Sequence, residues 1–546
     1  MKNKVKHICA FTFAALLAFS CLLFPAAVST DDLVSTYSLK LDLSDVSDDF
    51  MVISSGSSDY SQDFLNAAAD IAEGALNFEE KIYISDYNLK SSDVLSLFSY
   101  VRYEYPELIN VSNSFSYGRY QSGIITYVSP HYIFGKSERD KYFTPFYSVI
   151  DKVTAQAEML NNDFLKALFV HDYLVKNSRY ATEIFDPSFD SKSIEGQFVY
   201  NAYGNLVNGF SVCQGYSFAY KAIMDRLFID VDYVISDEMN HVWNTVTIYG
   251  KTYHTDVTFD DPTPDVIGRV YHTNFLCTDD EITAEDHYSW TTTEDISTQS
   301  YPMRFWDNVK SQICISGDDM YYTESDEAVN AKLVKRSASL NKAQVIPSTL
   351  SNTYWRVMDG MAYYPGSYSR IEMLNDTLYY SMPGGVNSIS VDGSNDKTVY
   401  TLPESAQGRI YGFVLRNGKF YGQISKTPNE SGEIAELDIS HIEDITEPST
   451  DRPTEAPTEP VTDAPTDKPT ETPTETPTEP EVNIGDVDRN GKITVADAVM
   501  IQKHIANIIT LGEKECKLAD TDGNGKLTVA DAVMIQKYIA NIIPGF

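Results

Sequence analysis

The chain has 546 residues, which is enough for several domains of roughly 100–200 residues each. Its formal net charge of −36 excludes a nucleic-acid partner, because phosphates are bound by an excess of Lys and Arg. A hydrophobic content of 42% is that of a globular protein, and the negative charge favours a soluble, self-repelling chain.

Residues 1–29 have the pattern of a secretory signal peptide. The basic stretch "MKNKVK" precedes an apolar core over residues 8–24, and the small residues of "PAAVS" follow it. We expect cleavage near Ser29 or Thr30, so that the mature protein is secreted and has no membrane span. Two alternatives stay open. One is a membrane anchor, since the core is only just long enough to span a bilayer. The other is a lipoprotein attached through Cys21, for which Ala18 fits poorly.

Residues 30–155 and 156–295 are predicted to form an α+β lead-in region and an α+β core. The segments "SSDVLSLFSYVRYEYPEL" and "NDFLKALFVHDYLVKNSRY" place apolar residues at helical spacing. The segment "NHVWNTVTIYGKTYHTDVTF" alternates on both sides of the turn "YGKT", which predicts two paired strands. We assign no chemistry to the lead-in region.

Four widely spaced cysteines remain after the signal peptide: Cys213, Cys277, Cys314 and Cys516. A secreted protein of this size does not need disulfides, although a Cys277–Cys314 bridge stays open. Cys213 stands in "NGFSVCQGYSFAYKAIMDRL", just where an apolar-periodic stretch begins. It is a buried small hydrophobe, half of a disulfide, or a nucleophile at a helix N-terminus.

Two downstream residues favour the nucleophile. His241 opens the first strand of the predicted hairpin, and Asp256 lies on the second. Paired strands are about 4.8 Å apart, so these side chains can be cross-strand neighbours. A thiol that faces a histidine oriented by an aspartate is the nucleophile, base and orienting group of covalent catalysis. The helix N-terminus favours a thiolate, and the N–H groups there, including that of Cys213, suit an oxyanion.

The order of these motifs resembles the transglutaminase-like superfamily, which has a papain-like core. The resemblance covers about residues 157–290 and is carried by Cys213, "HVWN" and "YHTDVTFDDP". It implies a catalytic triad of Cys213, His241 and Asp256. Phe259 stands where the bacterial branch often has Trp.

The remaining residues of this region are predicted to be supporting ones. Gly209 and Gly215 allow close backbone approach, and Trp243 shields the histidine from water. The structural residues are His254, His171 and Tyr216, with a turn formed by Asp260, Asp261 and Pro262.

Residues 300–445 change to turn–strand units with aromatic residues, such as "GDDMYYTE", "DGMAYYPG" and "NDTLYYSM". "SISVDGSNDKTVYTL" predicts a hairpin around Asp-Gly. Two spacings of about 42 residues indicate repeated β-units such as propeller blades, in too small a number to close a propeller. We expect an all-β module with propeller-like repeats, in which the tyrosines pack; sugar stacking is the alternative.

Residues 446–480 are predicted to be a linker of Thr, Pro and acidic residues. Proline recurs every few residues and almost no apolar side chain is available to bury. We expect an extended spacer, partly of polyproline type, at ~3 Å per residue.

Residues 483–546 contain a repeat at an offset of 34, in which "TVADAVMIQKHIANII" returns as "TVADAVMIQKYIANII". Each copy follows an acidic loop, "DVDRNGKITVAD" or "DTDGNGKLTVAD". Ca²⁺ binds six to eight oxygens at about 2.3–2.6 Å, and alternate positions of such a loop supply them. The predicted ligands of two Ca²⁺ ions are Asp486, Asp488, Asn490, the Lys492 carbonyl and Asp497, and Asp520, Asp522, Asn524, the Lys526 carbonyl and Asp531. Because the carboxylates repel one another, we expect the ions to drive folding.

This segment resembles a type I dockerin, the paired F-hand module of cellulosomes. The resemblance implies an all-α fold, two Ca²⁺ ions, and binding to a cohesin module of a scaffoldin. It places partner contacts at Val495, Ala496, Lys503, Val529, Ala530 and Lys537. The well-known clostridial pattern has Ser-Thr at the first pair, and Val-Ala departs from it. The near identity of the copies implies two binding orientations.

The sequence therefore predicts a secreted component, bound to a cellulosome or cell surface, with a cysteine active site. The favoured activity is hydrolysis or transfer at peptide amides through a Cys213 thioester. One alternative is a non-catalytic binding component in which the core is an inactive scaffold. Another is a polysaccharide-degrading glycoside hydrolase, which only the dockerin suggests, since two catalytic carboxylates cannot be picked out.

Overall fold

The computed structural model describes residues 33–40, 60–292, 294–325, 331–357, 362–364, 367–430 and 432–439, with scattered residues between 484 and 538. These fall into two compact units, one that runs to residue 441 and one after it. The predicted signal peptide and linker lie outside the described residues. Among the described helices, none is both long enough and apolar enough to cross a membrane.

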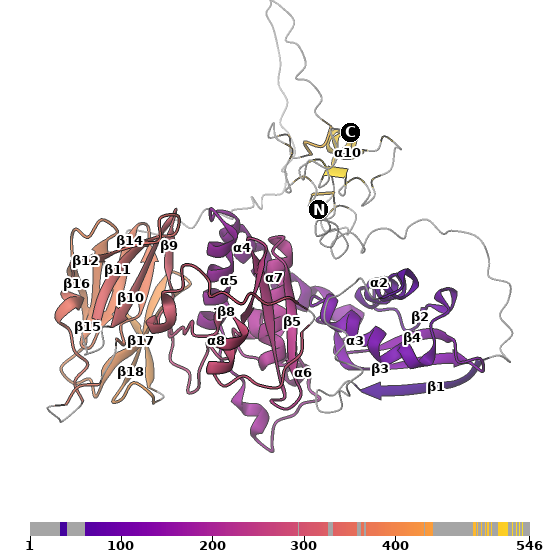
Figure 1. The fold of residues 1–546 in the computed structure, drawn as a ribbon, viewed down its shortest axis with the longest axis horizontal. Helices are drawn as coiled ribbons and strands as arrows, with labels where there is room; N and C mark the ends of the chain where they lie inside the picture. The colour runs from indigo at the N-terminus through magenta and orange to yellow at the C-terminus, as the bar shows by residue number, and fades with distance from the viewer. Residues whose placement is uncertain are drawn as a thin grey trace, which may run out of the picture. The chain divides into compact units, whose positions relative to one another are not determined.

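The lead-in region of the first unit has a four-stranded antiparallel sheet in the order β1-β3-β4-β2 (Figure 1). Its helix α2 is capped by Ser61, whose side chain accepts a hydrogen bond from the Phe64 N–H. The elements are β1 (Leu33–Lys40), α2 (Gln62–Leu76), β2 (Ile82–Tyr83), α3 (Val94–Glu104), β3 (Val111–Tyr120) and β4 (Ile125–Tyr132). The sequence predicted helix α3.

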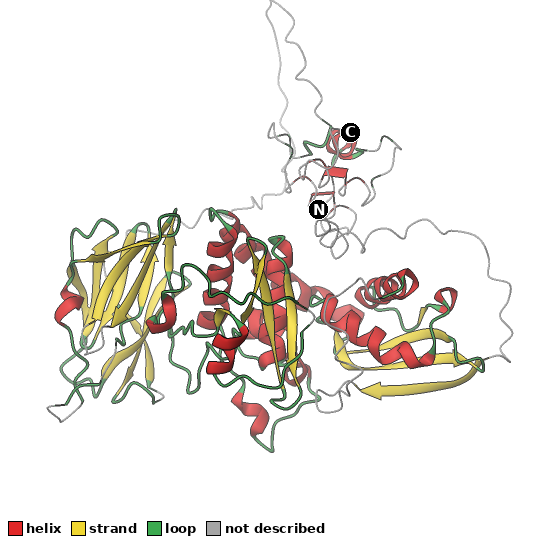
Figure 2. Cartoon of the chain, viewed as in Figure 1, coloured by secondary structure: helices red, strands yellow, loops and turns green. Residues whose placement is uncertain are grey.

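The core combines helices with a four-stranded antiparallel sheet in the order β5-β6-β7-β8 (Figure 2). Helix α7 packs against β5 and β6, and α4 and α5 pack against α7. The elements are α4 (Arg139–Glu158), α5 (Asp163–Asn177), α6 (Ile194–Phe198), α7 (Cys213–Arg226), β5 (Val231–Ser236), β6 (His241–Ile248), β7 (Lys251–Thr255), β8 (Phe275–Cys277) and α8 (Asp279–Ala284). One apolar cluster joins this core to the lead-in region.

Two predicted elements position the site. Helix α5 begins after Asn162, which caps it by accepting from the Leu165 N–H. The predicted hairpin is β6 and β7, joined by Tyr249 and Gly250, which both have positive φ. Such a two-residue turn matches the twist of paired strands, so it fixes the register of β6 against β7.

The β-rich region consists of three antiparallel sheets, each built from strands that follow one another in sequence. The strands are β9 (Cys314–Ser316), β10 (Asp319–Ser325), β11 (Ala331–Ser337), β12 (Lys342–Ile346), β13 (Ile371–Leu374), β14 (Thr377–Met382), β15 (Gly385–Ser390), β16 (Lys397–Thr401), β17 (Arg409–Arg416), β18 (Lys419–Ser425) and β19 (Glu433–Leu437). The expected Asp-Gly hairpin is β15 with β16. The multidomain α+β and β-rich organisation is confirmed, and the propeller-like arrangement stays a prediction.

The β-rich sheets are hydrogen-bonded to the core. The Ile313 N–H donates to Asp172 on α5 at 2.7 Å, and the Phe413 N–H donates to the Ile267 carbonyl at 2.9 Å. Lys176 at the end of α5 forms an ion pair with Glu372 on β13 at 3.2 Å. The predicted boundaries at 156–295 and 300–445 therefore divide a single compact unit and stay predictions.

In the second unit, the structure describes helix α10 (Glu513–Ala519) and a small apolar cluster. The buried members of this cluster are Val487, Ile501, Leu511, Ala519 and Ile535. Both copies of the repeat contribute to it, because Ile501 and Ile535 stand at equivalent positions 34 residues apart. The two copies of the repeat therefore share one apolar core.

Candidate active site

Cys213 is the first residue of helix α7, and Val212 before it has extended backbone. Only glycine fits two residues later, because a Cβ on Gly215 would lie 2.5 Å from the Ser211 Cβ and 2.9 Å from the Asn201 carbonyl oxygen. The Cys213 side chain therefore stands at the positive end of the helix dipole, which favours an anion there. The residue is 5% exposed.

The structure brings the three residues of the predicted triad together. His241 is the first residue of β6, and its Nε2 lies 2.6 Å from Oδ2 of Asp256, just after β7. The two strands pair from Asn244 opposite Thr255 onward, so the contact is diagonal. Cys213 lies near enough to the His241 ring to contribute to the rise of its pKa. Because Nε2 donates to the carboxylate, Nδ1 is the ring nitrogen that can take the thiol proton.

Burial and charge act in opposite directions on this pair. Burial lowers the pKa of His241, but the charge and hydrogen bond of Asp256, together with the nearby Cys213, outweigh it and raise that pKa to about 10. Burial also works against ionised Asp256, but the charge of His241 and the hydrogen bonds of both histidines hold the Asp256 pKa well below its usual range. At neutral pH the pair is therefore an imidazolium and a carboxylate, which stabilise a nearby thiolate.

A second histidine, His287, binds the same carboxylate. Its Nε2 lies 2.9 Å from Asp256 Oδ2, the oxygen that also binds His241. The other oxygen, Oδ1, accepts from the N–H groups of Thr258 at 2.9 Å and Phe259 at 3.2 Å. Sequence reasoning missed His287, because it stands in an irregular segment after α8 that shows no motif.

Aromatic rings cover the two histidines. The Trp243 ring stacks on His241 with centroids 5.5 Å apart, and Phe259 lies 4.8 Å from His241 and 4.4 Å from His287. The Trp243 indole N–H donates to Nδ1 of His254 at 3.1 Å, which leaves His254 Nε2 to donate to Asp279 at 2.9 Å. Trp243 is therefore held in place by His254, and Phe259, at 38% exposed, is the outer cover.

The core holds another histidine–aspartate cluster deeper inside. His171 on α5 binds Asp172 at 2.9 Å and Asp260 at 3.0 Å, and His272 binds Asp172 at 2.9 Å. Burial lowers the pKa of His171, but the hydrogen bonds and charges of the two carboxylates raise it to about 9. The sequence placed His171 in the core and Asp260 in a structural turn, but it did not predict that they bind each other.

Each cluster brings three possible metal ligands within 4.8 Å of one another, namely His171, Asp172 and His272, or His241, Asp256 and His287. Ligands around a tetrahedral Zn²⁺, at about 2.0–2.1 Å from the ion, are separated by about 3.3 Å. The nitrogen–oxygen distances in the two clusters are 2.6–3.0 Å, which are those of hydrogen bonds. Both clusters are therefore hydrogen-bonded networks.

The described cysteines are all free, so the Cys277–Cys314 bridge that the sequence left open is absent. Cys277 donates to the Thr273 carbonyl, and burial raises its pKa to about 12. Burial likewise raises the pKa of Cys314 well above its ordinary value. Both thiols are buried, and their raised pKa values disfavour the reactive thiolate.

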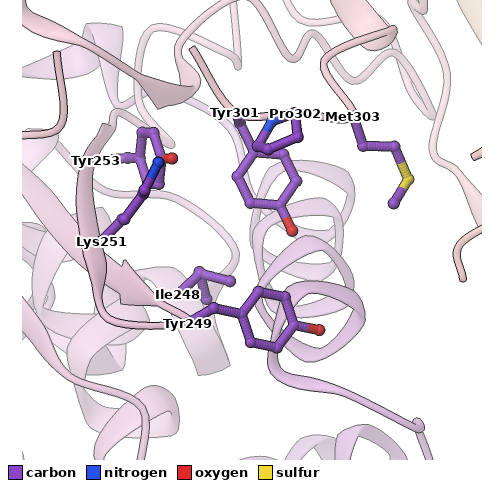
Figure 3. Close-up of a pocket in the computed structure, with 7 residues that line it drawn as sticks. All are labelled: Ile248, Tyr249, Lys251, Tyr253, Tyr301, Pro302 and Met303. Atoms are coloured by element: carbon purple, nitrogen blue, oxygen red, sulfur yellow. The ribbon is translucent and has the colours of Figure 1, made fainter. Parts of the chain in front are cut away.

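A hollow of about 300 Å³ lies at the far end of β6, around the β6–β7 turn (Figure 3). Its lining residues are Ile248, Tyr249, Lys251, Tyr253, Tyr301, Pro302 and Met303. His241 stands at the opposite end of the same strand, eight residues long at about 3.3 Å per residue. The hollow is therefore not the substrate cleft of the Cys213 site.

The structure describes four of the ten predicted calcium ligands. Asp497 and Asp531 are fully buried, Asp486 is 6% exposed, and Asp520 is half-buried. Buried carboxylates are costly unless they are paired or coordinate a metal, so these acidic residues fit a Ca²⁺ site. The predicted residues outside the described part are Asp488, Asn490, Lys492, Asp522, Asn524 and Lys526, together with the partner contacts Val495, Ala496, Lys503, Val529, Ala530 and Lys537.

Two of the solved structures that match the chain show low overall likeness to it. A structure described as that of a TGase is 14% identical with a TM-score of 0.19, and the alignment covers 27% of this chain and 44% of that one. A candidate cysteine protease from Cytophaga hutchinsonii is 17% identical with a TM-score of 0.16, and the alignment covers 27% of this chain and 53% of that one. The chain thus spans about half the length of each. The active-site assignment rests on the geometry around Cys213.

The comparison with protein families is specific for the C-terminal repeat. No curated protein matches the chain. The family model described as "Dockerin type I domain" matches residues 484–540, which contain both acidic loops. Residues 484–540 are therefore a type I dockerin domain, as the duplicated loops predicted.

Proposed function

We propose that the protein is a secreted cysteine enzyme that acts on amide bonds and is attached to a scaffold by its dockerin. Cys213 is the nucleophile, His241 the general base and acid, and Asp256 the group that orients His241. The observation that carries the proposal is the arrangement of Cys213 at the N-terminus of α7, close enough to influence His241, which is itself hydrogen-bonded to Asp256.

The chemistry follows from these positions. The Cys213 sulfur attacks the carbonyl carbon of an amide, and N–H groups of the first turn of α7 stabilise the oxyanion. The C–N bond breaks as the His241 imidazolium gives its proton to the leaving amine, which leaves a thioester on Cys213. Neutral His241 then takes a proton from water or from a second amine, which attacks the thioester. Water gives hydrolysis, and an amine gives a transferred amide.

The dockerin would attach the enzyme to a scaffold protein. A type I dockerin supports binding to a cohesin module, and the pair Val495–Ala496, with its repeat in the second copy, would read that partner. Bound Ca²⁺ supplies the positive charge that lets the acidic loops come together. The residues that would hold the ions include Asp486 and Asp497 in the first loop and Asp520 and Asp531 in the second.

Thioester trapping tests the proposed activity. The full-length protein is incubated with a library of peptides that contain primary and secondary amides, with and without a primary amine, and Cys213 is analysed by mass spectrometry. We expect an acyl adduct on Cys213 and release of the leaving amine, both absent in Cys213→Ala and unchanged in Cys277→Ala. Turnover that survives in Cys213→Ala would contradict the proposal. A protein that forms no adduct but still binds the library would be the non-catalytic component.

A further inference from the structure

The hollow at the β6–β7 turn is built from tyrosine rings that two separate segments supply. Tyr249 and Tyr253 come from the hairpin, and Tyr301 comes from the segment that precedes the β-rich sheets (Figure 3). The rings of Tyr253 and Tyr301 meet edge to face with centroids 5.6 Å apart, and Phe164 on α5 stacks on Tyr301 at 5.1 Å. Tyr253 is 1% exposed and Tyr301 is 6% exposed, so these two rings form a fixed floor.

Tyr249 stands at the rim of the hollow, in a position that stability does not explain. It is 68% exposed, and it has a φ of 52° as the first of the two turn residues. A two-residue turn with positive φ at both positions favours Asn, Asp or Gly, because most side chains are strained there. A large ring that is both strained and exposed costs stability, and such strain concentrates at ligand sites. The placement therefore indicates a ligand that contacts the Tyr249 ring.

Polar groups lie beside these rings. The hydroxyls of Tyr249 and Tyr301 have no hydrogen-bond partner among the residues that the structure describes. The Lys251 amine donates to Oε1 of Gln299 at 3.0 Å, which leaves its other protons and the Gln299 amide protons for a ligand. The hollow thus offers apolar ring faces together with several hydrogen-bond donors and acceptors.

Two other ligand classes fit the hollow poorly. An extended peptide binds by adding its main chain to a free strand edge, but β6 and β7 each pair with a strand on both sides. An acidic polymer needs a cluster of positive charge. Lys251 is the one charged residue among the seven described lining residues, and the chain has a net charge of −36. The ligand that remains is neutral, with an apolar face and polar edges.

We propose that the hollow is a binding subsite for a neutral polysaccharide and holds one or two sugar rings of a longer chain. A pyranose ring has carbon-bound hydrogens on its faces and hydroxyls around its edge. Its face packs on the Tyr249 ring, and its hydroxyls bond to the Lys251 amine and the Tyr301 hydroxyl. The volume of about 300 Å³ is at the small end of the range of ligand pockets, which suits one or two rings.

The subsite is separate from the Cys213 site, because His241 stands at the opposite end of β6. It attaches the protein to a glycan and performs no chemistry. The proposal therefore stands whether or not Cys213 is a nucleophile.

The test is the substitution Tyr249→Asn in the full-length protein. Asn removes the ring and is a residue that the turn prefers. Migration is compared in native gels that contain hydroxyethyl cellulose, arabinoxylan or glucomannan, in a plain gel, and in a gel with the acidic polymer polygalacturonate. Tyr83→Asn is the matched control, because Tyr83 on β2 is also 68% exposed and lies outside the hollow.

We expect at least one neutral polysaccharide to retard the wild type and Tyr83→Asn equally. In Tyr249→Asn the dissociation constant for that polymer should rise by on the order of tenfold, because an aromatic contact is lost. The melting temperature of Tyr249→Asn should equal or exceed that of the wild type, since the strain at the turn is relieved.

Equal retardation of the wild type and Tyr249→Asn would place glycan binding elsewhere in the chain and would overturn the inference. No retardation by any neutral polymer, or retardation by polygalacturonate alone, would overturn it as well. A lower melting temperature of Tyr249→Asn would show that the ring serves folding, which would remove the argument from the strained turn and with it the proposal.

Discussion

The two histidine–aspartate clusters of the core use the same side chains for different purposes. In one, Asp256 binds His241 and His287; in the other, Asp172 binds His171 and His272, and Asp260 closes the far side of His171. Both contain hydrogen bonds of 2.6–3.0 Å and both raise the pKa of a histidine. The first touches Cys213 at the start of α7, and the second touches backbone of the β-rich region at Ile313.

The two clusters differ in the groups that contact the ring nitrogens of their central histidines. His241 is 8% exposed and has a thiol on its free side, whereas both nitrogens of His171 are occupied by carboxylates in a site closed to solvent. Removing one partner of a buried ion pair destabilises the fold, but a proton held between two carboxylates cannot be passed to a substrate. A histidine with a shifted pKa therefore marks a functional site only where one of its ring nitrogens faces a nucleophile or a substrate.

The largest expected effect is a difference in alkylation rate between Cys213, beside the His241 cluster, and the buried thiols Cys277 and Cys314. At pH 6, iodoacetamide should label Cys213 at least ~10³-fold faster than Cys277 or Cys314, because burial raises the pKa values of the latter two thiols. Peptide mapping by mass spectrometry after short exposure measures the three rates. Equal labelling of Cys213 and Cys277 would contradict the assignment of Cys213 as the activated thiol of the His241 cluster.

The next effect is on stability. His171→Gln removes the charge between two buried carboxylates, so we expect the free energy of unfolding to fall by about 3–5 kcal/mol. Urea denaturation at pH 6 measures it, with His131→Gln on the exposed face of β4 as the control. The pH steps of Cys213 alkylation should stay unchanged in folded His171→Gln. A shift of those steps would show that the two clusters act as one.

The pH dependence of unfolding follows from the same shift. The pKa of His171 in the folded protein, about 9, is above the value of about 6.5 in an unfolded chain, so its stabilising contribution is complete below about pH 6.5. It is lost as pH rises through about 9. Thermal melts of the wild type should therefore fall between pH 6.5 and 9.5, and those of His171→Gln should fall less. Parallel curves for the two proteins would contradict this origin.

The smallest expected effect is that of a metal chelator on the core, where we expect no change. Because both clusters are hydrogen-bonded networks, a calcium and zinc chelator should change neither Cys213 alkylation nor the melting of the core. The same chelator should expose residues 484–540 to protease, since the carboxylates of the dockerin loops then repel one another. Inhibition of Cys213 reactivity by chelator would mean that a metal takes part in the His241 cluster.

The sequence predicts the residues that stand in strong local patterns. The acidic loops at a fixed offset, the helix that starts at Cys213 and the hairpin that carries His241 all repeat or alternate within a short window. The partners of Asp256 beyond His241 could not be found in this way, because His287 reaches it from an irregular segment after α8. The His171–Asp260 contact likewise joins residues 89 apart in sequence. The sequence left open whether Cys277 and Cys314 form a disulfide. In the structure each thiol instead donates to a backbone carbonyl.

The central claim is that Cys213 is an ion-paired nucleophile, and one comparison tests it most directly. The alkylation rate of Cys213 is measured against pH in the wild type and in His241→Ala. We predict rapid alkylation of Cys213 at about pH 6 in the wild type, because the imidazolium of His241 favours the anionic sulfur, and a large loss of that rate in the variant. Equal and slow alkylation at about pH 6 in both proteins would contradict the account and make the core an inactive scaffold.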